Sequence, residues 1–377
     1  MAQLLFLASA LFWIAFLHPY LFYPLSLRAM KARPATPGTM PRPSASLLFS
    51  AYNEERALPA KLANIEAIKA LYPDLEVIAY SDASSDDTLS LLQSRPDLLR
   101  VIPAEERAGK AAGMRRMVES ARGDICIYTD ANVLLDPSSV GCLLDYFRNP
   151  DIGGVSGTLR YVNDADSATA EVGGLYWRLE ERIKALESRC GSMMGADGSI
   201  FATRRALYPV VPAHLLDDMT VSMSVLFAGL RLISAPDVIA YERNTTDARD
   251  EFRRKRRIAC RAFNTHRHLL PQIKAHFSLT DRYKYLSHKL LRWLGAPILV
   301  AAVATLTAAL LMSGLDRLAI GLWVAGGLVL LLGGSLGIRP FAIISGISAS
   351  ILATFIGVTD AWRGRRYQTW SPAKSRD

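Results

Sequence analysis

Long segments without charged side chains lie at both ends of this chain, and they limit what it can fold into. Residues 3–27 contain no Asp, Glu, Lys or Arg, and residues 295–359 contain very few. A helix needs about 20 apolar residues to cross a bilayer, and the stretches 3–27, 296–312, 318–338 and 340–359 are close to or above that length. The residues between them have the charge-rich composition of ordinary globular proteins. We therefore expect a soluble domain held between membrane segments.

Basic residues predict the orientation of these segments. No Lys or Arg precedes the first apolar segment, whereas Arg28, Lys31 and Arg33 follow it closely. The positive-inside rule then places the N-terminus outside and the central domain in the cytoplasm, in a multi-pass protein of the inner (cytoplasmic) membrane. Three further crossings would leave the C-terminus outside, although the tail after residue 361 is basic. We therefore expect one C-terminal stretch, most simply the last, to lie along the interface or to re-enter, with the tail in the cytoplasm.

The formal net charge of +9 fits three kinds of partner, namely nucleic acid, anionic lipid and phosphorylated substrates. Basic residues are concentrated in the segment 249–294, where aromatic residues accompany them just before the apolar stretches. This pattern is typical of helices on the cytoplasmic leaflet, so we expect membrane lipid rather than nucleic acid as a partner. The four cysteines show no metal-binding or disulfide spacing, which fits a reducing compartment.

The central part of the chain alternates short apolar runs with helical patterns. Such alternation predicts an α/β fold with a mostly parallel sheet that is covered on both faces. We expect Tyr176 and Trp177 to face the core from their helix. Strands are expected near 46–50, 75–80, 98–102, 125–130, 152–159 and 200–202, and helices over 56–71 and 168–188 and after Lys110 and Asp217. The expected segments are a membrane anchor (1–27), a Pro-rich linker (28–45), the soluble domain (46–248), basic interfacial helices (249–294), transmembrane helices (295–360) and a basic tail (361–377).

The run from Gly123 to Asn132 contains the most informative local pattern. Its apolar residues 125–128 predict a buried parallel strand, and Asp130 and Asn132 follow at the carboxyl end. Open α/β sheets bind ligands just beyond the carboxyl ends of their strands, so both side chains are expected in such a crevice. A carboxylate beside an amide oxygen suits a divalent cation that also contacts a substrate phosphate. Both residues are also favoured as helix N-caps, and the pattern alone leaves the two interpretations open.

Five short motifs occur in a fixed order along the domain. They are Ala51-Tyr52-Asn53-Glu54, Asp82-Ala83-Ser84-Ser85-Asp86-Asp87, Arg107-Ala108-Gly109-Lys110, Thr129-Asp130-Ala131-Asn132 and Leu216-Asp217-Asp218. This order resembles the family 2 inverting glycosyltransferases with a GT-A fold, the group that contains cellulose, chitin and hyaluronan synthases. The resemblance covers residues 46–262 and fits the flanking membrane segments. It implies a Rossmann-like GT-A catalytic domain that uses a nucleotide sugar, with UDP as the expected nucleotide.

The resemblance also implies which residues contact the donor. Asp82 would hold the uracil or the ribose, and Lys110 would contact the nucleotide or its phosphates. Asp130, with Asn132, would bind an Mg²⁺ or Mn²⁺ ion that neutralises the leaving diphosphate. The family often has a second Asp at the position of Asn132, so this site carries one charge fewer. The implied donor-binding residues are Ala51, Tyr52, Asn53, Glu54, Asp82, Arg107, Gly109, Lys110, Asp130, Arg254 and Arg257.

The acidic pair Asp217-Asp218 resembles the pair whose second carboxylate is the family's general base. An inverting transfer needs one carboxylate to take the proton from the acceptor hydroxyl. The resemblance gives this role to Asp218, with Asp217 in support, although either residue is also suited to cap a helix. Gly195 and Asp197 resemble the turn that faces the acceptor in the same enzymes, and Asp197 would bond a sugar hydroxyl there.

The clearest departure from the family follows this acidic pair. Processive relatives carry Gln-x-x-Arg-Trp, and the corresponding residues here are Arg254, Arg257 and Ile258. Arg257 is suited to clamp a diphosphate bidentately, but Ile258 lacks the aromatic surface on which an acceptor sugar would stack. Trp370 in the tail is a further candidate for the acceptor side, with an interfacial anchor as its alternative role.

These features favour an enzyme that moves a sugar, with inversion, from a nucleotide donor to a glycan or a polyprenyl-linked acceptor. The expected setting is exopolysaccharide or envelope glycan synthesis at the inner membrane surface. A processive synthase that secretes its own polymer is the alternative within the same chemistry. A membrane subunit that binds a nucleotide without catalysis is the alternative from another class.

Overall fold

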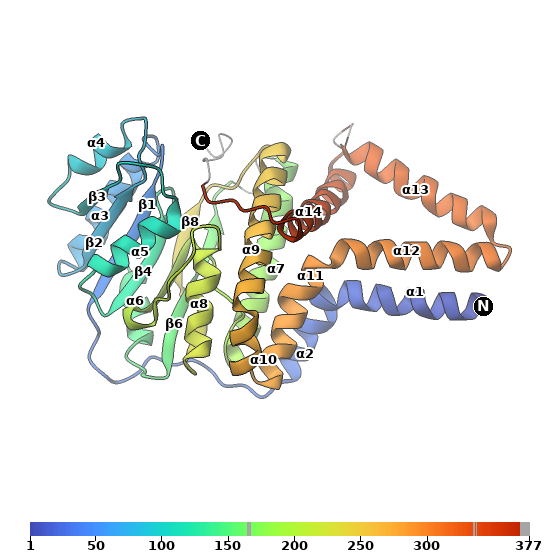
Figure 1. Ribbon diagram of the computed structural model, residues 1–377, viewed down its shortest axis with the longest axis horizontal. Coiled ribbons are helices and arrows are strands. Elements are labelled where there is room, and N and C mark those ends of the chain that lie inside the picture. Colours follow the sequence, from blue (N-terminus) through green and yellow to red (C-terminus); the bar gives the residue numbers. More distant parts are fainter. Residues whose placement is uncertain (164–166, 335, 337, 370–377) are drawn as a thin grey trace.

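The computed structural model describes residues 1–163, 167–334, 336 and 338–369 (Figure 1). The strands of its central sheet are β1 (Ala45–Ala51), β2 (Glu76–Ser81), β3 (Arg100–Pro103), β4 (Ile125–Asp130), β5 (Leu134–Leu135), β6 (Ile152–Tyr161), β7 (Ile200–Arg204) and β8 (Arg231–Glu242). Their order is β3-β2-β1-β4-β7-β6-β8-β5. Strands β1 to β4 are parallel, β7 runs antiparallel between β4 and β6, and β8 is parallel to β6. The predicted mostly parallel sheet is confirmed.

Helices cover both faces of this sheet because its strand side chains are apolar on both sides. Successive residues of a strand point to opposite faces. Phe49 of β1 therefore packs in the cluster that contains Ile65 of α3, whereas Leu48 packs in the cluster that contains Met114 of α5. The helices of this domain are α3 (Leu58–Leu71), α4 (Thr88–Gln93), α5 (Lys110–Ser120), α6 (Ser139–Tyr146), α7 (Ala168–Arg189), η2 (Arg205–Leu207) and α8 (Asp217–Phe227). The sequence patterns do not predict β8, because Pro236 and Asp237 interrupt its apolar run.

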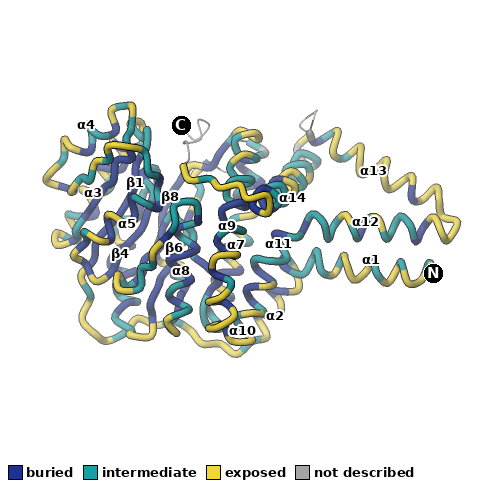
Figure 2. The backbone as a smooth tube through the Cα atoms, viewed as in Figure 1, coloured by how far each residue is buried: buried dark blue, intermediate teal, exposed yellow. Residues whose placement is uncertain are grey.

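Four helical segments are long and apolar enough to cross a membrane, namely Ala2–Ala29, Gly295–Met312, Asp316–Gly333 and Pro340–Trp362. They contain α1 (Ala2–Leu17), η1 (His18–Phe22), α2 (Tyr23–Ala29), α12 (Gly295–Met312), α13 (Asp316–Gly334) and α14 (Arg339–Trp362). Helices α1 and α12 pack side by side and extend away from the sheet (Figure 1). Figure 2 shows many exposed residues along α1 and α13 and mostly intermediate ones along α12, as expected of helices that could cross a membrane.

The last apolar helix, α14, instead packs along α9 (Ala248–His276) and α7. The helices α9 and α14 approach closely at Gly357, where a Cβ would lie 2.3 Å from the carbonyl oxygen of Arg256. The buried Asp360 of α14 also accepts hydrogen bonds from Nε and Nη2 of Arg256 at 2.6 and 3.1 Å. The first helix of the expected interfacial segment thus packs between α8 and α14. The rest of that segment forms α10 (Leu279–Tyr285), η3 (Leu286–Leu290) and α11 (Leu291–Trp293).

Candidate active site

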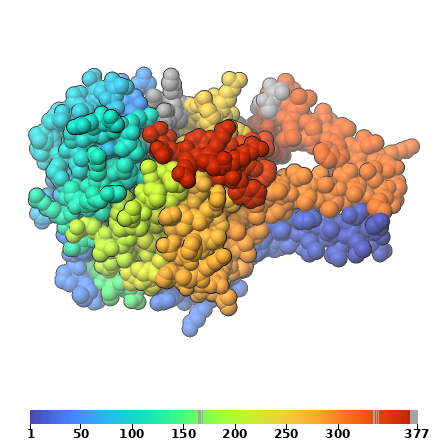
Figure 3. Space-filling view, viewed as in Figure 1, coloured from blue at the N-terminus to red at the C-terminus, as the bar shows by residue number. Residues whose placement is uncertain are grey.

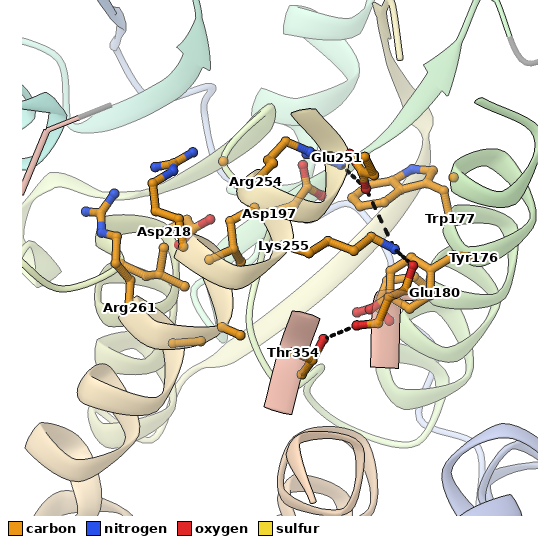
Figure 4. A pocket seen from close by; sticks show the side chains of 18 of the residues that line it. Tyr176, Trp177, Glu180, Asp197, Asp218, Glu251, Arg254, Lys255, Arg261 and Thr354 are labelled. Atoms are coloured by element: carbon orange, nitrogen blue, oxygen red, sulfur yellow. Dashed lines mark hydrogen bonds and ion pairs between the residues drawn. The ribbon is translucent and has the colours of Figure 1, made fainter. Parts of the chain in front are cut away.

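A cavity of about 1390 Å³ lies at the carboxyl ends of the parallel strands, where Ser50 of β1 and Asp130 of β4 line it. Helices α7, α8, α9 and α14 supply most of the remaining wall. Figure 4 shows Asp197, Asp218 and Arg254 around the same space. The predicted site residues that line this cavity are Glu54, Lys110, Asp130, Asn132, Gly195, Asp197, Asp217, Asp218, Arg254 and Arg257.

Lys110, the first residue of α5, connects the two acidic groups of the site. Its Nζ lies 2.6 Å from Oδ1 of Asp130 and 4.0 Å from Oδ2 of Asp217. Burial alone would lower the pKa of Lys110, but the carboxylates of Asp130 and Asp217 raise it above its usual value. The ammonium group therefore stays charged. Residues that are about 90 positions apart in sequence thus form one charged cluster.

Asp217 and Asp218 are the first two residues of α8, where carboxylates are favoured by the helix dipole. The predicted acceptor turn reaches them, because a Cβ on Gly198 would lie 3.3 Å from Oδ2 of Asp218 and 3.2 Å from Nζ of Lys110. Burial and the neighbouring carboxylate of Asp217 raise the pKa of Asp218 to about 6. A carboxylate with this pKa is suited to accept a proton near neutral pH.

Asp130 and Asn132 fit a divalent cation with few protein ligands. Asn132 donates from Nδ2 to Oε1 of Glu242 at 3.2 Å, so its amide oxygen is the atom able to bind a metal. Within the described part of the chain, no group of three or more His, Cys, Asp or Glu side chains is placed to hold a metal. One carboxylate and one amide oxygen still suit Mg²⁺ or Mn²⁺, because such an ion keeps waters and takes oxygens from substrate phosphates.

Asp82 lies beside the cavity but is not among the residues that line it. Its carboxylate is fully buried. It accepts hydrogen bonds from the backbone N–H groups of Ala108 at 2.8 Å and Gly109 at 3.0 and 3.1 Å. Asp82 therefore fixes the backbone that leads into Lys110. Its contact with a nucleotide stays a prediction.

The loop after β1 is held by the neighbouring loop after β2. Asn53 has a φ of +53°, which Asn tolerates better than most residues. Its Oδ1 accepts a hydrogen bond from the backbone N–H of Ser85 at 2.9 Å. The guanidinium carbon of Arg107 lies 3.5 Å from the ring centroid of Tyr52. The predicted donor residues that are not among those lining the cavity are Ala51, Tyr52, Asn53, Asp82, Arg107 and Gly109.

Asp197 and Gly195 lie in the turn before β7, and both line the cavity. Oδ2 of Asp197 accepts from Nζ of Lys184 at 2.9 Å, and Oδ1 accepts from the backbone N–H of Ser199 at 3.1 Å. Lys184 also contacts Glu181 at 2.7 Å. The carboxylate of Asp197 is therefore fixed in place, and its contact with an acceptor stays a prediction.

Helix α7 contributes cavity residues that the sequence analysis missed. The expectation that Tyr176 faces the core is wrong, because this side chain is 42% exposed and lines the cavity together with Trp177 (Figure 4). Glu180, one turn further along α7, and Glu242, at the end of β8, line it as well. The sequence does contain a pattern that indicates Glu242, because this carboxylate stands at the end of an apolar run. No sequence pattern indicates the cavity residues of α7, because the surroundings of its exposed face are set by the apolar helices packed near it.

The residues at the position of the Gln-x-x-Arg-Trp motif all reach the cavity from α9. Arg254, Arg257 and Ile258 line it. Nε of Arg254 lies 2.8 Å from Oε2 of Glu251, so this guanidinium is fixed by an ion pair on its own helix. The cationic character of this wall agrees with the predicted diphosphate contact, which stays a prediction for both arginines.

The C-terminal tail returns to the part of the cavity that is next to Gly109. Figure 3 shows the red C-terminal segment lying across the front of the molecule toward the sheet domain. Tyr367 and Thr369 line the cavity, and the carbonyl oxygen of Gln368 lies against Gly109. Trp370, the predicted acceptor residue of this tail, lies outside the described residues.

The contact between Gly109 and the tail leads to a testable prediction. Gly109 has a φ of +85°, and a Cβ there would lie 2.6 Å from the carbonyl oxygen of Gln368. We expect Gly109→Ala to destabilise the fold by about 1–3 kcal/mol through backbone strain and to push the tail away. Because small displacements near a reacting centre are costly, transfer activity should fall by on the order of 10- to 100-fold.

Gly229→Ala is the matched control for this prediction. Gly229 also has a positive φ, +74°, but a Cβ there would meet no atom within 4 Å. Thermal unfolding should therefore show a loss of stability in both variants, whereas activity per folded molecule should fall only in Gly109→Ala. Equal activities for the two variants would mean that the tail contact plays no part in transfer.

Comparison with known proteins identifies the domain. Residues 46–210 match the model of the Glycosyl transferase family 2. The N-acetylglucosaminyltransferase of Rhizobium meliloti is 26% identical over 235 residues, which are 57% of this chain and 54% of that protein. The poly-beta-1,6-N-acetyl-D-glucosamine synthase of Staphylococcus epidermidis is 26% identical over 121 residues, 31% of this chain and 29% of that protein. The chain therefore spans about half or less of the length of these curated relatives.

The fold is also similar to a solved structure. The mannosyltransferase PcManGT from Pyrobaculum calidifontis, in complex with GDP-Man and Mn²⁺, superposes with a TM-score of 0.73. The two chains are 22% identical, and the match covers 94% of this chain and 99% of the other. Residues 46–210 therefore match a Glycosyl transferase family 2 domain, and the fold of the chain is the GT-A fold of glycosyltransferases.

Proposed function

We propose that the protein transfers a sugar, with inversion, from a nucleoside diphosphate sugar to a hydroxyl of a glycan or a polyprenyl-linked acceptor. UDP-linked hexoses and N-acetylhexosamines are the first donor candidates, because the curated relatives are named for N-acetylglucosamine. The observation that carries the proposal is that Lys110, Asp130 and Asp218 line one cavity. The apolar helices beside that cavity support a place at the cytoplasmic surface of the inner membrane.

The residues divide the reaction between them. Lys110 and Arg257 would bind the diphosphate of the donor, since both are cations on the cavity wall. Asp218 would take the proton from the acceptor hydroxyl as its oxygen attacks the anomeric carbon. Asp217 supports this role by raising the pKa of Asp218. A divalent cation held by Asp130 and Asn132 would neutralise charge on the leaving diphosphate.

The direct test uses the full-length protein purified in detergent. A panel of nucleotide sugars is screened for release of the nucleoside diphosphate in the presence of Mg²⁺ or Mn²⁺, with glycan and lipid-linked acceptors. Release with one added sugar per acceptor supports the proposal, whereas a ladder of products identifies a processive synthase. Nucleotide binding without release across the whole panel would overturn it in favour of a non-catalytic nucleotide-binding subunit.

The pKa of Asp218 predicts the pH dependence of transfer. Below a pH of about 6 this carboxylate gains a proton and no longer accepts one. We therefore expect kcat/KM to fall by about tenfold per pH unit on the acid side of that value. In Asp217→Asn the neighbouring charge that raises the pKa of Asp218 is absent, so the acid limb should move to lower pH. Profiles of kcat/KM from about pH 5 to 8 compare the two proteins, and identical limbs would contradict the assignment of the base.

A further inference from the structure

The cavity is larger than an ordinary small-molecule site. Its volume of about 1390 Å³ exceeds the roughly 300–1,000 Å³ of ordinary small-molecule sites. Figure 4 shows Asp218 on one side of it and Tyr176, Trp177 and Glu180 on the other, with Arg254 and Lys255 between them. The side away from Asp218 therefore offers space for a second substrate.

That side of the cavity is built largely from apolar side chains of the helices that could span a membrane. Phe16, Leu17 and Leu21 come from the first span, Ile347 and Ile351 from α14, and Leu175 from α7. Leu21, Leu175 and Ile347 are 53%, 43% and 46% exposed. An apolar chain that lies here continues into the lipid around these helices. Its apolar surface therefore stays out of contact with water, which is favourable.

Basic side chains outnumber acidic ones between the apolar wall and the carboxylates. Arg254 and Lys255 lie 2.8 and 3.6 Å from Glu251, and Arg292 and Lys289 lie 2.5 and 3.8 Å from Glu180. All of these residues line the cavity. These ion pairs set four cations against two carboxylates, and Glu242 near Arg254 and Glu187 near Lys289 add negative charge from further away. An anion at this level of the cavity would lie among all four cations.

Arg292 has buried donor atoms that its carboxylate neighbour Glu180 does not use. Nε and Nη2 of Arg292 are buried and have no hydrogen-bond partner among the residues described by the structure. The guanidinium lies 5.6 Å from the ring of Tyr20 and 5.9 Å from the ring of Tyr176. Desolvated cations of this kind bind phosphate oxygens well.

We propose that this part of the cavity holds a lipid phosphate that carries the acceptor sugar. The apolar chain lies along Leu175 and Ile347, the phosphate lies at Lys255 and Arg292, and the sugar extends toward Asp218. The inference rests on the proposed function and deepens it, because it selects a lipid-linked acceptor over a free glycan. The acceptor then enters sideways from the membrane instead of from the cytoplasm.

The presence of a general base defines which atom of this acceptor reacts. The hydroxyl oxygen of the acceptor sugar forms a bond to the anomeric carbon of the donor, and the bond from that carbon to the diphosphate oxygen breaks. The hydroxyl proton goes to Asp218, and the nucleoside diphosphate leaves. A hydroxyl needs such a base at neutral pH, whereas an ionised phosphate oxygen does not. The lipid phosphate is therefore the carrier of the acceptor sugar and not the nucleophile.

Binding of a radiolabelled long-chain polyprenyl phosphate to the full-length protein in detergent tests this inference. The corresponding polyprenol and inorganic phosphate serve as competitors, because each reproduces one half of the probe. We expect the polyprenyl phosphate to bind at least about tenfold more tightly than either competitor. Lys255→Gln should weaken its binding by roughly tenfold through loss of a charged contact, and Leu175→Trp should weaken it similarly by filling the groove.

Two substitutions outside the cavity are the matched controls. Lys274→Gln removes a lysine from the same helix as Lys255, and Leu328→Trp enlarges a span residue that is 50% exposed, similar to Leu175. Both should bind the probe as the unchanged protein does. Equal binding of polyprenyl phosphate and polyprenol, or full binding by both cavity variants, would overturn the inference. Donor turnover on soluble glycans without probe binding would overturn the lipid-phosphate inference and leave the proposed function intact. Probe binding without any turnover would support the lipid-phosphate site and overturn the proposed function.

Discussion

Asp218→Asn should lose transfer activity and keep its donor affinity. The substitution preserves the size of the side chain but removes the carboxylate whose pKa is raised to about 6. A positioned general base typically contributes on the order of 10²–10⁴-fold to the rate, so kcat should fall by that factor. The donor phosphates are assigned to Lys110 and Arg257, and for this reason the dissociation constant of the donor should change by less than about threefold. Single-turnover assays and equilibrium binding of the nucleoside diphosphate measure the two quantities.

The control for this variant is Asp316→Asn. Asp316 also lies in the first turn of a helix, α13, but it is not among the residues that line the cavity. It should retain full activity, which separates the loss of a base from the loss of a helix-terminal charge. If Asp218→Asn lost donor affinity and activity together, Asp218 would be part of the donor site instead of the base.

Local patterns were sufficient to predict most strands of the sheet, though not β8, and the polar residues that follow the parallel strands. β1, β2 and β4 are buried on both faces, so their sequences are continuous apolar runs. The polar residues that follow them stand out for the same reason, and Asp130 is therefore found at the carboxyl end of β4 as predicted. The charged cluster of Lys110, Asp130 and Asp217 also needs the positions of α5 and α8, because Lys110 and Asp217 are the first residues of these helices.

Other features depend on contacts between segments that are distant in the sequence, and local patterns contain no information about these contacts. Asp82 has the composition of a ligand-binding turn, but its orientation is decided by the backbone of Ala108 and Gly109. Tyr176 has the pattern of a core residue on α7, and only the positions of α1 and α14 show that its surroundings are a cavity. The attachment of α14 to α9 depends on Gly357 and on the pair of Arg256 with Asp360. Hydropathy treats α14 as another span and contains no information about this packing.

Asp130→Ala should abolish the dependence of donor binding on a divalent cation. In the proposed site Asp130 is the only carboxylate assigned to the metal, because Asn132 replaces the second acidic residue. A divalent cation held by Asp130 and Asn132 would lose its charged protein ligand in this variant. We expect transfer to fall by on the order of 10²–10³-fold, the usual cost of removing charge stabilisation from a transition state. Donor affinity, measured with Mn²⁺ and again with EDTA, should become equal under the two conditions.

Lys110→Ala is the matched control for Asp130→Ala, because both substitutions break the same ion pair of 2.6 Å. Any loss of stability from that pair is therefore common to the two variants. Lys110→Ala should bind the donor more weakly, since a cation assigned to the phosphates is absent, yet its binding should still respond to Mn²⁺ and EDTA. Asp130→Ala alone should lose that response. If both variants kept the response to Mn²⁺ and EDTA, the metal would be held by other residues. If both variants lost this response, metal binding would require the ion pair of Lys110 with Asp130.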